Sequence, residues 1–219
     1  VKSLEGISDN TQKRFIFRKI FYKTLGELLQ ENNIKYLLQG TVQSDKEMLT
    51  RGQEQHNVGV QFQKYGIRDI IEPLSDLYKP QIREIARFLK LPKKISERQS
   101  FPGPGLIIRC LGEITREKIE IIREAQYITE QELSYLNPFQ VVVSISGDLV
   151  ASMRERAIPD KYMLIVRAVK SKDAMTAKAI FPSRKLKNRL EERLMNISNK
   201  IGRILWGFTD KPPATIEYI

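Results

Sequence analysis

The sequence predicts an α/β protein built in two parts, residues 1–99 and residues 100–219. The first part alternates helical and strand patterns, which is typical of an open α/β sheet. The second part gives the order β-α-β-β-α-β, which predicts a small α+β domain whose helices cover one face of a sheet. The polar stretch 92–99 separates the two parts and is the predicted domain boundary.

The composition is typical of a soluble globular protein, because 41% of the 219 residues are hydrophobic and 29% are charged. No apolar run approaches the roughly 20 residues that span a bilayer, and no signal-peptide pattern opens the chain. The single cysteine, Cys110, lies in an apolar run and is predicted to be a buried hydrophobic residue. A single cysteine excludes an internal disulfide and a metal site built from several cysteines. The single histidine, His56, excludes a metal site built from several histidines. We therefore expect a cytoplasmic protein whose metal, if any, is held by carboxylates and phosphates.

The net charge is +11, and the basic surplus is spread along the chain. Residues 1–99 contain 18 Lys and Arg against 12 Asp and Glu, and residues 100–219 contain 19 against 14. Such a surface suits any polyanion, from a nucleotide to RNA. Because no RNA-binding motif is present, nucleic acid ranks last among the expected partners.

A long helix is predicted after the capping residues 8–10, because apolar residues recur at helical spacing from Phe17 to Leu29. Lys13 and Arg14 lie in its first turn, where the helix dipole favours a bound anion. We expect these two cations either to bind an anion or to stay solvated.

The next strand is predicted over residues 34–38, and Gly40 and Thr41 follow it closely. Glycine and threonine at the carboxyl end of a strand occur where open α/β sheets bind ligands. Residues 42–66 then form a polar connection whose length is typical of a functional lid or a disordered segment. The first part ends with a predicted strand over residues 67–74 and a helix that begins at Lys79-Pro80.

The second part opens with Phe-Pro-Gly-Pro-Gly-Leu over residues 101–106, which predicts a specified turn or an exposed backbone surface. The helices cover only one face of the predicted sheet, so the other face needs a partner, and we expect a homodimer. Strands are predicted over residues 106–111, 139–145, 162–169 and 203–209, and helices over residues 117–135 and 182–200.

The last nine residues, Lys-Pro-Pro-Ala-Thr-Ile-Glu-Tyr-Ile over 211–219, combine a lysine and a glutamate around two prolines. Proline restricts the backbone between the two charges. An ammonium group can bind a phosphate, and a carboxylate can accept hydrogen bonds from the N–H groups of a heterocycle. From the residues alone, an ordered tail with an edge strand over 215–218 remains the alternative.

Two of these segments, Lys-Pro-Pro-Ala-Thr-Ile-Glu-aromatic and Phe-Pro-Gly-Pro-Gly-Leu, resemble GMP synthase, the enzyme that aminates xanthosine monophosphate (XMP). The resemblance extends to the C-terminus without a large gap. It implies that residues 1–99 are the C-terminal half of an adenine-nucleotide α-hydrolase-like ATP-pyrophosphatase domain, with a lid over 42–66. It also implies that residues 100–219 are the GMP synthase dimerisation domain.

The resemblance implies that Lys211 binds the XMP phosphate, that Ile216 and Glu217 contact the base, and that Arg14 assists. It also implies ATP and Mg²⁺ as a substrate complex, a homodimer, and a separate glutamine amidotransferase that supplies ammonia. The implied XMP-binding residues are Arg14, Lys211, Ile216, Glu217, Asp148 and Asn137, and the implied ATP-side residues are Gly40, Thr41 and Asp45.

The chain departs from the family at several of these positions. Residues 56–59, His-Asn-Val-Gly, match the end of the family's lid motif, but Gln53 stands where the family has the lid lysine. Val150 stands at the arginine of a Gly-Asp-x-Arg loop, where Arg154 or Arg156 is a candidate replacement, and Asn137 stands where the family has glutamine.

These 219 residues contain no Ser-Gly-Gly-Val-Asp-Ser loop, which cradles the pyrophosphate of ATP in the family. Without that loop we expect the chain alone to be inactive. Two interpretations stay open. In the first, the chain is a fragment or divergent copy of the GMP synthase polypeptide that aminates XMP to GMP with ATP. In the second, it is a non-catalytic dimeric paralogue with a purine-nucleotide-binding or regulatory role.

Overall fold

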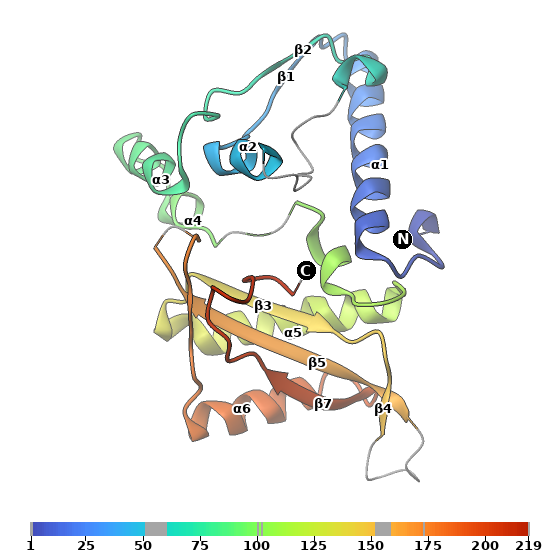
Figure 1. Cartoon of the computed structure of the whole chain (residues 1–219), viewed down its shortest axis with the longest axis vertical. Helices are drawn as coiled ribbons and strands as arrows, with labels where there is room; N and C mark the ends of the chain where they lie inside the picture. Colours follow the sequence, from blue (N-terminus) through green and yellow to red (C-terminus); the bar gives the residue numbers. More distant parts are fainter. Residues whose placement is uncertain are drawn as a thin grey trace. The chain divides into compact units, whose positions relative to one another are not determined.

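The computed structural model describes residues 2–50, 61–99, 101, 103–151, 159–172 and 174–218. The chain divides into two compact units, which we describe separately (Figure 1). The N-terminal unit is Arg14–Arg98, and the C-terminal unit is Val1–Lys13 together with Gln99–Ile219. The first helix therefore begins in the C-terminal unit and continues in the other. Four residues named above, Gln53, His56, Arg154 and Arg156, lie outside the described part of the chain.

The N-terminal unit is mostly helical and contains a short parallel ladder. The two strands of this ladder, β1 and β2, pair in register from Tyr36↔Asp69 to Leu38↔Ile71. The helix predicted at Lys79-Pro80 begins there. The elements are α1 (Asn10–Glu31), β1 (Tyr36–Leu38), α2 (Gln43–Thr50), a 3-10 turn (Phe62–Tyr65), β2 (Asp69–Ile71), α3 (Lys79–Phe88) and α4 (Lys93–Ser96).

The buried face of α1 differs in part from the predicted one, since Leu29 is buried as predicted but Phe21 is not. After its first turn, the buried residues are Tyr22, Gly26 and Leu29, whereas the neighbouring Phe21 is 47% exposed. The reason is Gly26, because a Cβ there would lie 2.0 Å from the carbonyl oxygen of Tyr65. The helix therefore turns its glycine toward the Phe62–Tyr65 turn, and that close approach selects the buried face.

The C-terminal unit is a sheet centred on its longest strand, β5, which pairs with the four other strands. Strand β3 is antiparallel to β5 from Gln140↔Val169 to Ile145↔Leu164, and β7 is parallel to β5. The elements are 3-10 turns (Lys2–Leu4, Gly105–Arg109, Ser134–Leu136), α5 (Arg116–Leu133), β3 (Gln140–Ile145), β4 (Val150–Ala151), β5 (Pro159–Lys170), β6 (Lys178–Ala179), α6 (Arg184–Met195) and β7 (Ile201–Trp206).

The predicted strand over residues 106–111 is wrong. The chain forms a 3-10 turn over Gly105–Arg109, and only Cys110 pairs with Ile145, in an isolated parallel bridge. Gly105 has a φ of +67°, which turns the chain sharply after Pro104. Cys110 is buried as predicted, together with Ile108, but in a curled backbone. The alternative edge strand over 215–218 is also not formed.

The two faces of this sheet are covered differently. Val141, Val143, Leu164 and Val166 share one face, and helix α5 packs against it. The other face, which we call the tail face, carries Gln140, Val142, Ser144, Ile165, Arg167 and Val169. In Figure 1 helix α5 passes behind β3 and β5, whereas the C-terminal segment crosses in front of them.

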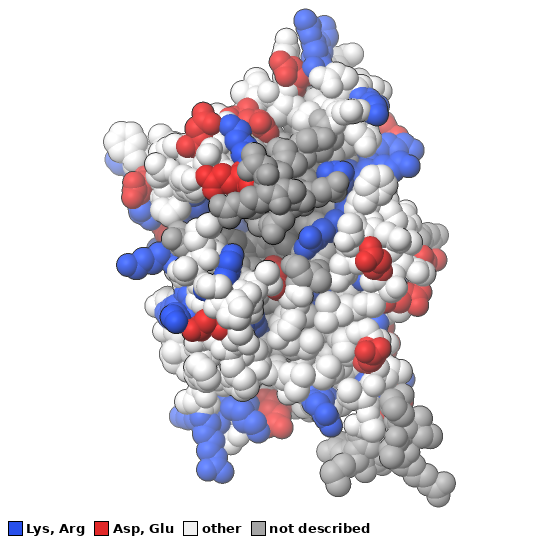
Figure 2. All heavy atoms as spheres, viewed as in Figure 1, with Lys and Arg blue, Asp and Glu red and all other residues white. Residues whose placement is uncertain are grey.

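The β3 and β5 residues of the tail face are buried within a single chain, since Val142 and Val169 are fully buried and pack against Ile216 of the C-terminal segment. Leu205 of β7, which pairs with Ile165 of the tail face, is 42% exposed, and the expected homodimer stays a prediction. On the face shown in Figure 2, basic and acidic side chains are interspersed. Among the described helices, none is long and apolar enough to span a bilayer.

Candidate functional site

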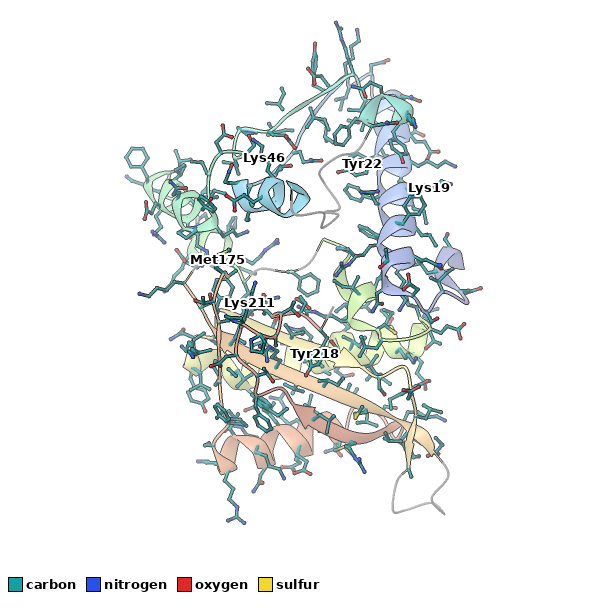
Figure 3. The ribbon with its side chains drawn as sticks, viewed as in Figure 1. Lys19, Tyr22, Lys46, Met175, Lys211 and Tyr218 are labelled. Carbon is teal, nitrogen blue, oxygen red and sulfur yellow. The ribbon has the colours of Figure 1, made fainter. Side chains whose placement is uncertain are left out.

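The C-terminal segment, defined as residues 207–218, is anchored first at Lys211. Its backbone exchanges two hydrogen bonds with Ala177, of 2.8 and 3.0 Å. Its ammonium donates to the carbonyl of Ala174 at 2.8 Å. An ammonium has three N–H donors, and the described residues accept from one of them, so two are left for a ligand. Figure 3 labels Lys211 and Tyr218, which mark the two ends of the candidate binding stretch.

The residue before Lys211 strengthens this anchor. The carboxylate of Asp210 accepts from Lys178 Nζ and from the backbone N–H of Ala179, each at 2.8 Å. These two hydrogen bonds hold the pKa of Asp210 below its ordinary value. The segment therefore enters the site with a fixed backbone.

The second anchor is apolar. Ile216 is 7% exposed and packs against Val142, Val169 and Ala177, with Phe139 beside this cluster. Burying a side chain of this size contributes roughly 1.5–3 kcal/mol. Ile216 therefore fixes the backbone of the next residue, Glu217, at the start of β3.

Glu217 is paired with Arg109 across 108 residues of sequence. Arg109 Nε donates to Oε2 at 3.0 Å, and Nη2 donates to Oε1 at 2.7 Å. Gln140 Nε2 also donates to Oε1. The arginine side chain is 1% exposed and the glutamate side chain 17%, so the pair is open on the side of the carboxylate.

Two further polar groups on the tail face have no hydrogen-bond partner among the described residues. They are the hydroxyl oxygen of Ser144 and the Nε and Nη2 nitrogens of Arg167, both buried. Arg167 lies beside the C-terminal segment, since its Cβ and Cγ and the hydroxyl of Tyr218 all approach Gly207. Burial raises the pKa of Tyr218, and the charge of Arg167 opposes that shift.

The remaining implied XMP residues lie at different places in the C-terminal unit. Asn137 is exposed just before β3, and Phe139, two residues later, packs beside Ile216. Asp148 is exposed beyond the other end of β3, which is six residues or about 20 Å long. Within one chain, Lys211, Ile216 and Glu217 are thus brought together, with Asn137 near them and Asp148 apart. Arg14 belongs to the N-terminal unit.

In the N-terminal unit, polar residues meet at the carboxyl ends of β1 and β2. Glu72 accepts from Gln39 Nε2 at 3.1 Å and from the hydroxyl of the buried Thr41. The hydroxyl of Tyr22 donates to Gln39 at 2.9 Å, and burial raises the pKa of Tyr22 to about 12. The carboxyl ends of parallel strands are where open α/β sheets bind ligands. Thr41 therefore belongs to a polar cluster with Gln39, its neighbour in the Gln-Gly-Thr motif, and with Glu72, which was not listed as a site residue.

The other two implied ATP-side residues differ from Thr41. Gly40 is exposed, with open space where a Cβ would lie. Asp45 lies in the first turn of α2, and its Oδ2 accepts from the backbone N–H of Val42 at 3.1 Å. Among the described residues, no group of three His, Cys, Asp or Glu side chains could hold a metal ion.

Two cations of the C-terminal unit, Lys13 and Arg109, are buried, and of these only Arg109 was not singled out from the sequence. Lys13 is fully buried, and its ammonium donates to Asn10 Oδ1, to the carbonyl of Cys110 at 2.8 Å and to the carbonyl of Gly112. Burial lowers the pKa of Lys13. Lys13 is therefore neither solvated nor free for an anion, contrary to expectation. Arg109 could have been found from the sequence because it is a charged residue inside an apolar run. A charged side chain that is buried with such a run requires a buried partner.

The loop that accepts from Lys13 makes a close backbone contact. Gly112 has a φ of +70°, and a Cβ there would lie 2.7 Å from the Cα of Gly147. Gly112→Ala is expected to lower the free energy of unfolding by about 1–3 kcal/mol more than Gly6→Ala. Gly6 is the matched control, because its φ is +74° and nothing lies within 4 Å of its Cβ position. Equal losses in urea unfolding of the two variants would show that the contact with Gly147 is unimportant.

Comparison with known proteins identifies relatives along almost the whole chain. Residues 128–218 match the family model described as GMP synthase C terminal domain. The chain is 40% identical to the B subunit of glutamine-hydrolyzing GMP synthase from Archaeoglobus fulgidus, over 99% of this chain and 72% of that protein. It is 39% identical to the B subunit from Pyrococcus abyssi, over 99% and 71%, and 37% identical to that from Haloarcula marismortui, over 98% and 70%.

Proposed function

Because the chain belongs to the family of GMP synthase B subunits, we propose that it binds XMP at its C-terminal segment and takes part in the ATP-dependent amination of XMP to GMP. The assignment to GMP synthesis, and so to purine biosynthesis by a ligase, follows from the family. The particular substrate, site and partners are the content of the proposal.

One observation carries the proposal: the C-terminal segment holds the Lys211 ammonium, with two N–H donors left over among the described residues, and six residues later it holds the carboxylate of Glu217 in a fixed position. A phosphate at Lys211 gains a charge-assisted hydrogen bond. The purine ring extends toward Glu217, whose carboxylate accepts from a ring N–H. Ile216 supports this stretch by packing into the sheet and so fixes the backbone that carries both charged residues.

The chemistry requires an oxygen of XMP to become a good leaving group. ATP, as its Mg²⁺ complex, supplies this by adenylating the oxygen, with release of pyrophosphate, and ammonia then displaces AMP. The protein contributes by holding XMP in one orientation at Lys211 and Glu217, which is the positional part of catalysis. The cluster of Gln39, Thr41 and Glu72 at the strand ends supports an ATP side in the N-terminal unit.

Ammonia is proposed to come from a second protein. The relatives are named as the B subunits of a glutamine-hydrolyzing enzyme. Cys110, the single cysteine, is buried, and burial raises the pKa of its thiol, so it is a poor nucleophile for glutamine hydrolysis. A separate glutamine amidotransferase is therefore the expected partner.

The second candidate function is that of a non-catalytic dimer with a purine-nucleotide-binding or regulatory role. Gln53, which stands at the position of the family's lid lysine, favours it. A neutral amide does not compensate the charge that develops on a phosphate during transfer. In this alternative the XMP site is kept and turnover is lost.

Titration calorimetry with XMP and with ATP, each alone, distinguishes the two functions. Binding of both nucleotides, followed by pyrophosphate release when ammonia is added, supports the amination of XMP. Binding of XMP without ATP supports the regulatory dimer. A chain that binds ATP and not XMP would contradict both, because both place XMP at the C-terminal segment.

A further inference from the structure

We infer that Arg109 is a positioning residue for base recognition: it holds the Glu217 carboxylate so that one acceptor position, on Oε2, is left for the purine. The inference rests on the proposed binding of XMP at the C-terminal segment. Arg109 itself is 1% exposed and does not reach a ligand, so it acts through Glu217.

The hydrogen bonds around Glu217 carry this inference. A carboxylate offers about four acceptor positions, two on each oxygen. The arginine fork takes one on each oxygen, through Nε to Oε2 and Nη2 to Oε1. Gln140 takes a second position on Oε1. With respect to the described residues, Oε2 therefore keeps one acceptor position, and the orientation of that position is set by the plane of the guanidinium.

The guanidinium is itself held by two further residues, Gln126 and Phe101. Its Nη1 donates to Gln126 Oε1 at 2.8 Å, and Gln126 also bonds the backbone of Val141 and Val143 in β3. Phe101 lies against it, with 4.5 Å between Cζ and the ring centroid. Arg109 thus connects the turn Gly105–Arg109, helix α5 and strand β3 to the residue that meets the base.

A lysine at this position tests the fork, because lysine keeps the positive charge and loses the planar pair of donors. The variants are Arg109→Lys, Glu217→Gln and the double variant. The probes are XMP and ribose 5-phosphate, which lacks the base, and the measurement is the dissociation constant by titration calorimetry. Ribose 5-phosphate reports the contact with Lys211 alone, so a general loss of structure would weaken both probes.

We expect Arg109→Lys to weaken XMP binding about tenfold or more, the size of one charge-assisted hydrogen bond. Binding of ribose 5-phosphate should stay within about twofold of wild type. The double variant should lose no more XMP affinity than the single variant that binds XMP less tightly, because both substitutions remove the same contact. Arg193→Lys is the matched control, since Arg193 pairs with the buried Glu132 on α5, and it should leave both probes unchanged.

Wild-type XMP affinity in Arg109→Lys, with reduced affinity in Glu217→Gln, would overturn the role of Arg109 and keep the proposed site. Wild-type affinity in Glu217→Gln would instead contradict the proposed contact with the base. If Arg109→Lys loses its circular dichroism signal, Phe101→Ala replaces it, because Phe101 is 46% exposed. That variant should weaken XMP binding about threefold and leave the binding of ribose 5-phosphate unchanged. An XMP affinity equal to that of wild type would overturn the inference.

Discussion

Lys211→Ala is expected to weaken XMP binding by about 1.5–3 kcal/mol, or roughly 10- to 150-fold, the range for a hydrogen bond to a charged group. The methyl group cannot replace the ammonium, which is held at the Ala174 carbonyl with two donors to spare among the described residues. The backbone bonds between Lys211 and Ala177 do not use the side chain, so the segment should keep its path. Titration calorimetry with XMP measures the loss.

Lys187→Ala is the matched control for this variant. It removes the same charge from α6, where Lys187 is 57% exposed and pairs with Glu191. Its XMP affinity should equal that of wild type, because an exposed charge remote from the ligand is screened by salt. An unchanged affinity in a folded Lys211→Ala variant, or equal losses in the two variants, would remove Lys211 from the site.

Lys13→Met is expected to lower the free energy of unfolding by about 2–5 kcal/mol, because it leaves the buried carbonyl of Cys110 and the partly buried carbonyl of Gly112 without the ammonium that bonds them. Methionine fills a similar volume, so the loss reports the hydrogen bonds and not a cavity. Urea unfolding followed by circular dichroism measures it.

Lys23→Met makes the same substitution further along α1. Lys23 is 69% exposed and lies 3.8 Å from Glu27, so its loss should cost no more than about 0.5 kcal/mol. Equal midpoints for Lys13→Met and Lys23→Met would show that the buried ammonium contributes nothing to stability.

The elements that could be predicted from the sequence are those whose patterns are long. Helix α5 and strand β5 appear near their predicted positions, because a periodic apolar pattern reports burial directly. The strand predicted over 106–111 is not formed. An apolar run indicates burial but does not indicate the backbone conformation, and the positive φ of Gly105 begins a 3-10 turn there. The buried face of α1 was predicted only in part, because the approach of Gly26 to Tyr65 depends on tertiary structure.

The candidate site could be predicted from the sequence only where its residues lie within one local motif. Lys211 and Glu217 lie within seven residues that resemble a known family, so they could be listed together. Arg109 could not be found in this way, because its partner is 108 residues away. The capture of Lys13 by the Cys110–Gly112 loop is equally remote in sequence. Pairings of this kind become visible only when the fold brings the strands and turns together.

The most direct test of the XMP site is a crystal structure of the protein with XMP bound. We predict a phosphate oxygen within about 3.2 Å of Lys211 Nζ and a ring N–H of the base directed at Glu217 Oε2. A phosphate bound elsewhere, with the Lys211 ammonium still bonded only to the carbonyl of Ala174, would contradict the assignment of the C-terminal segment as the XMP site.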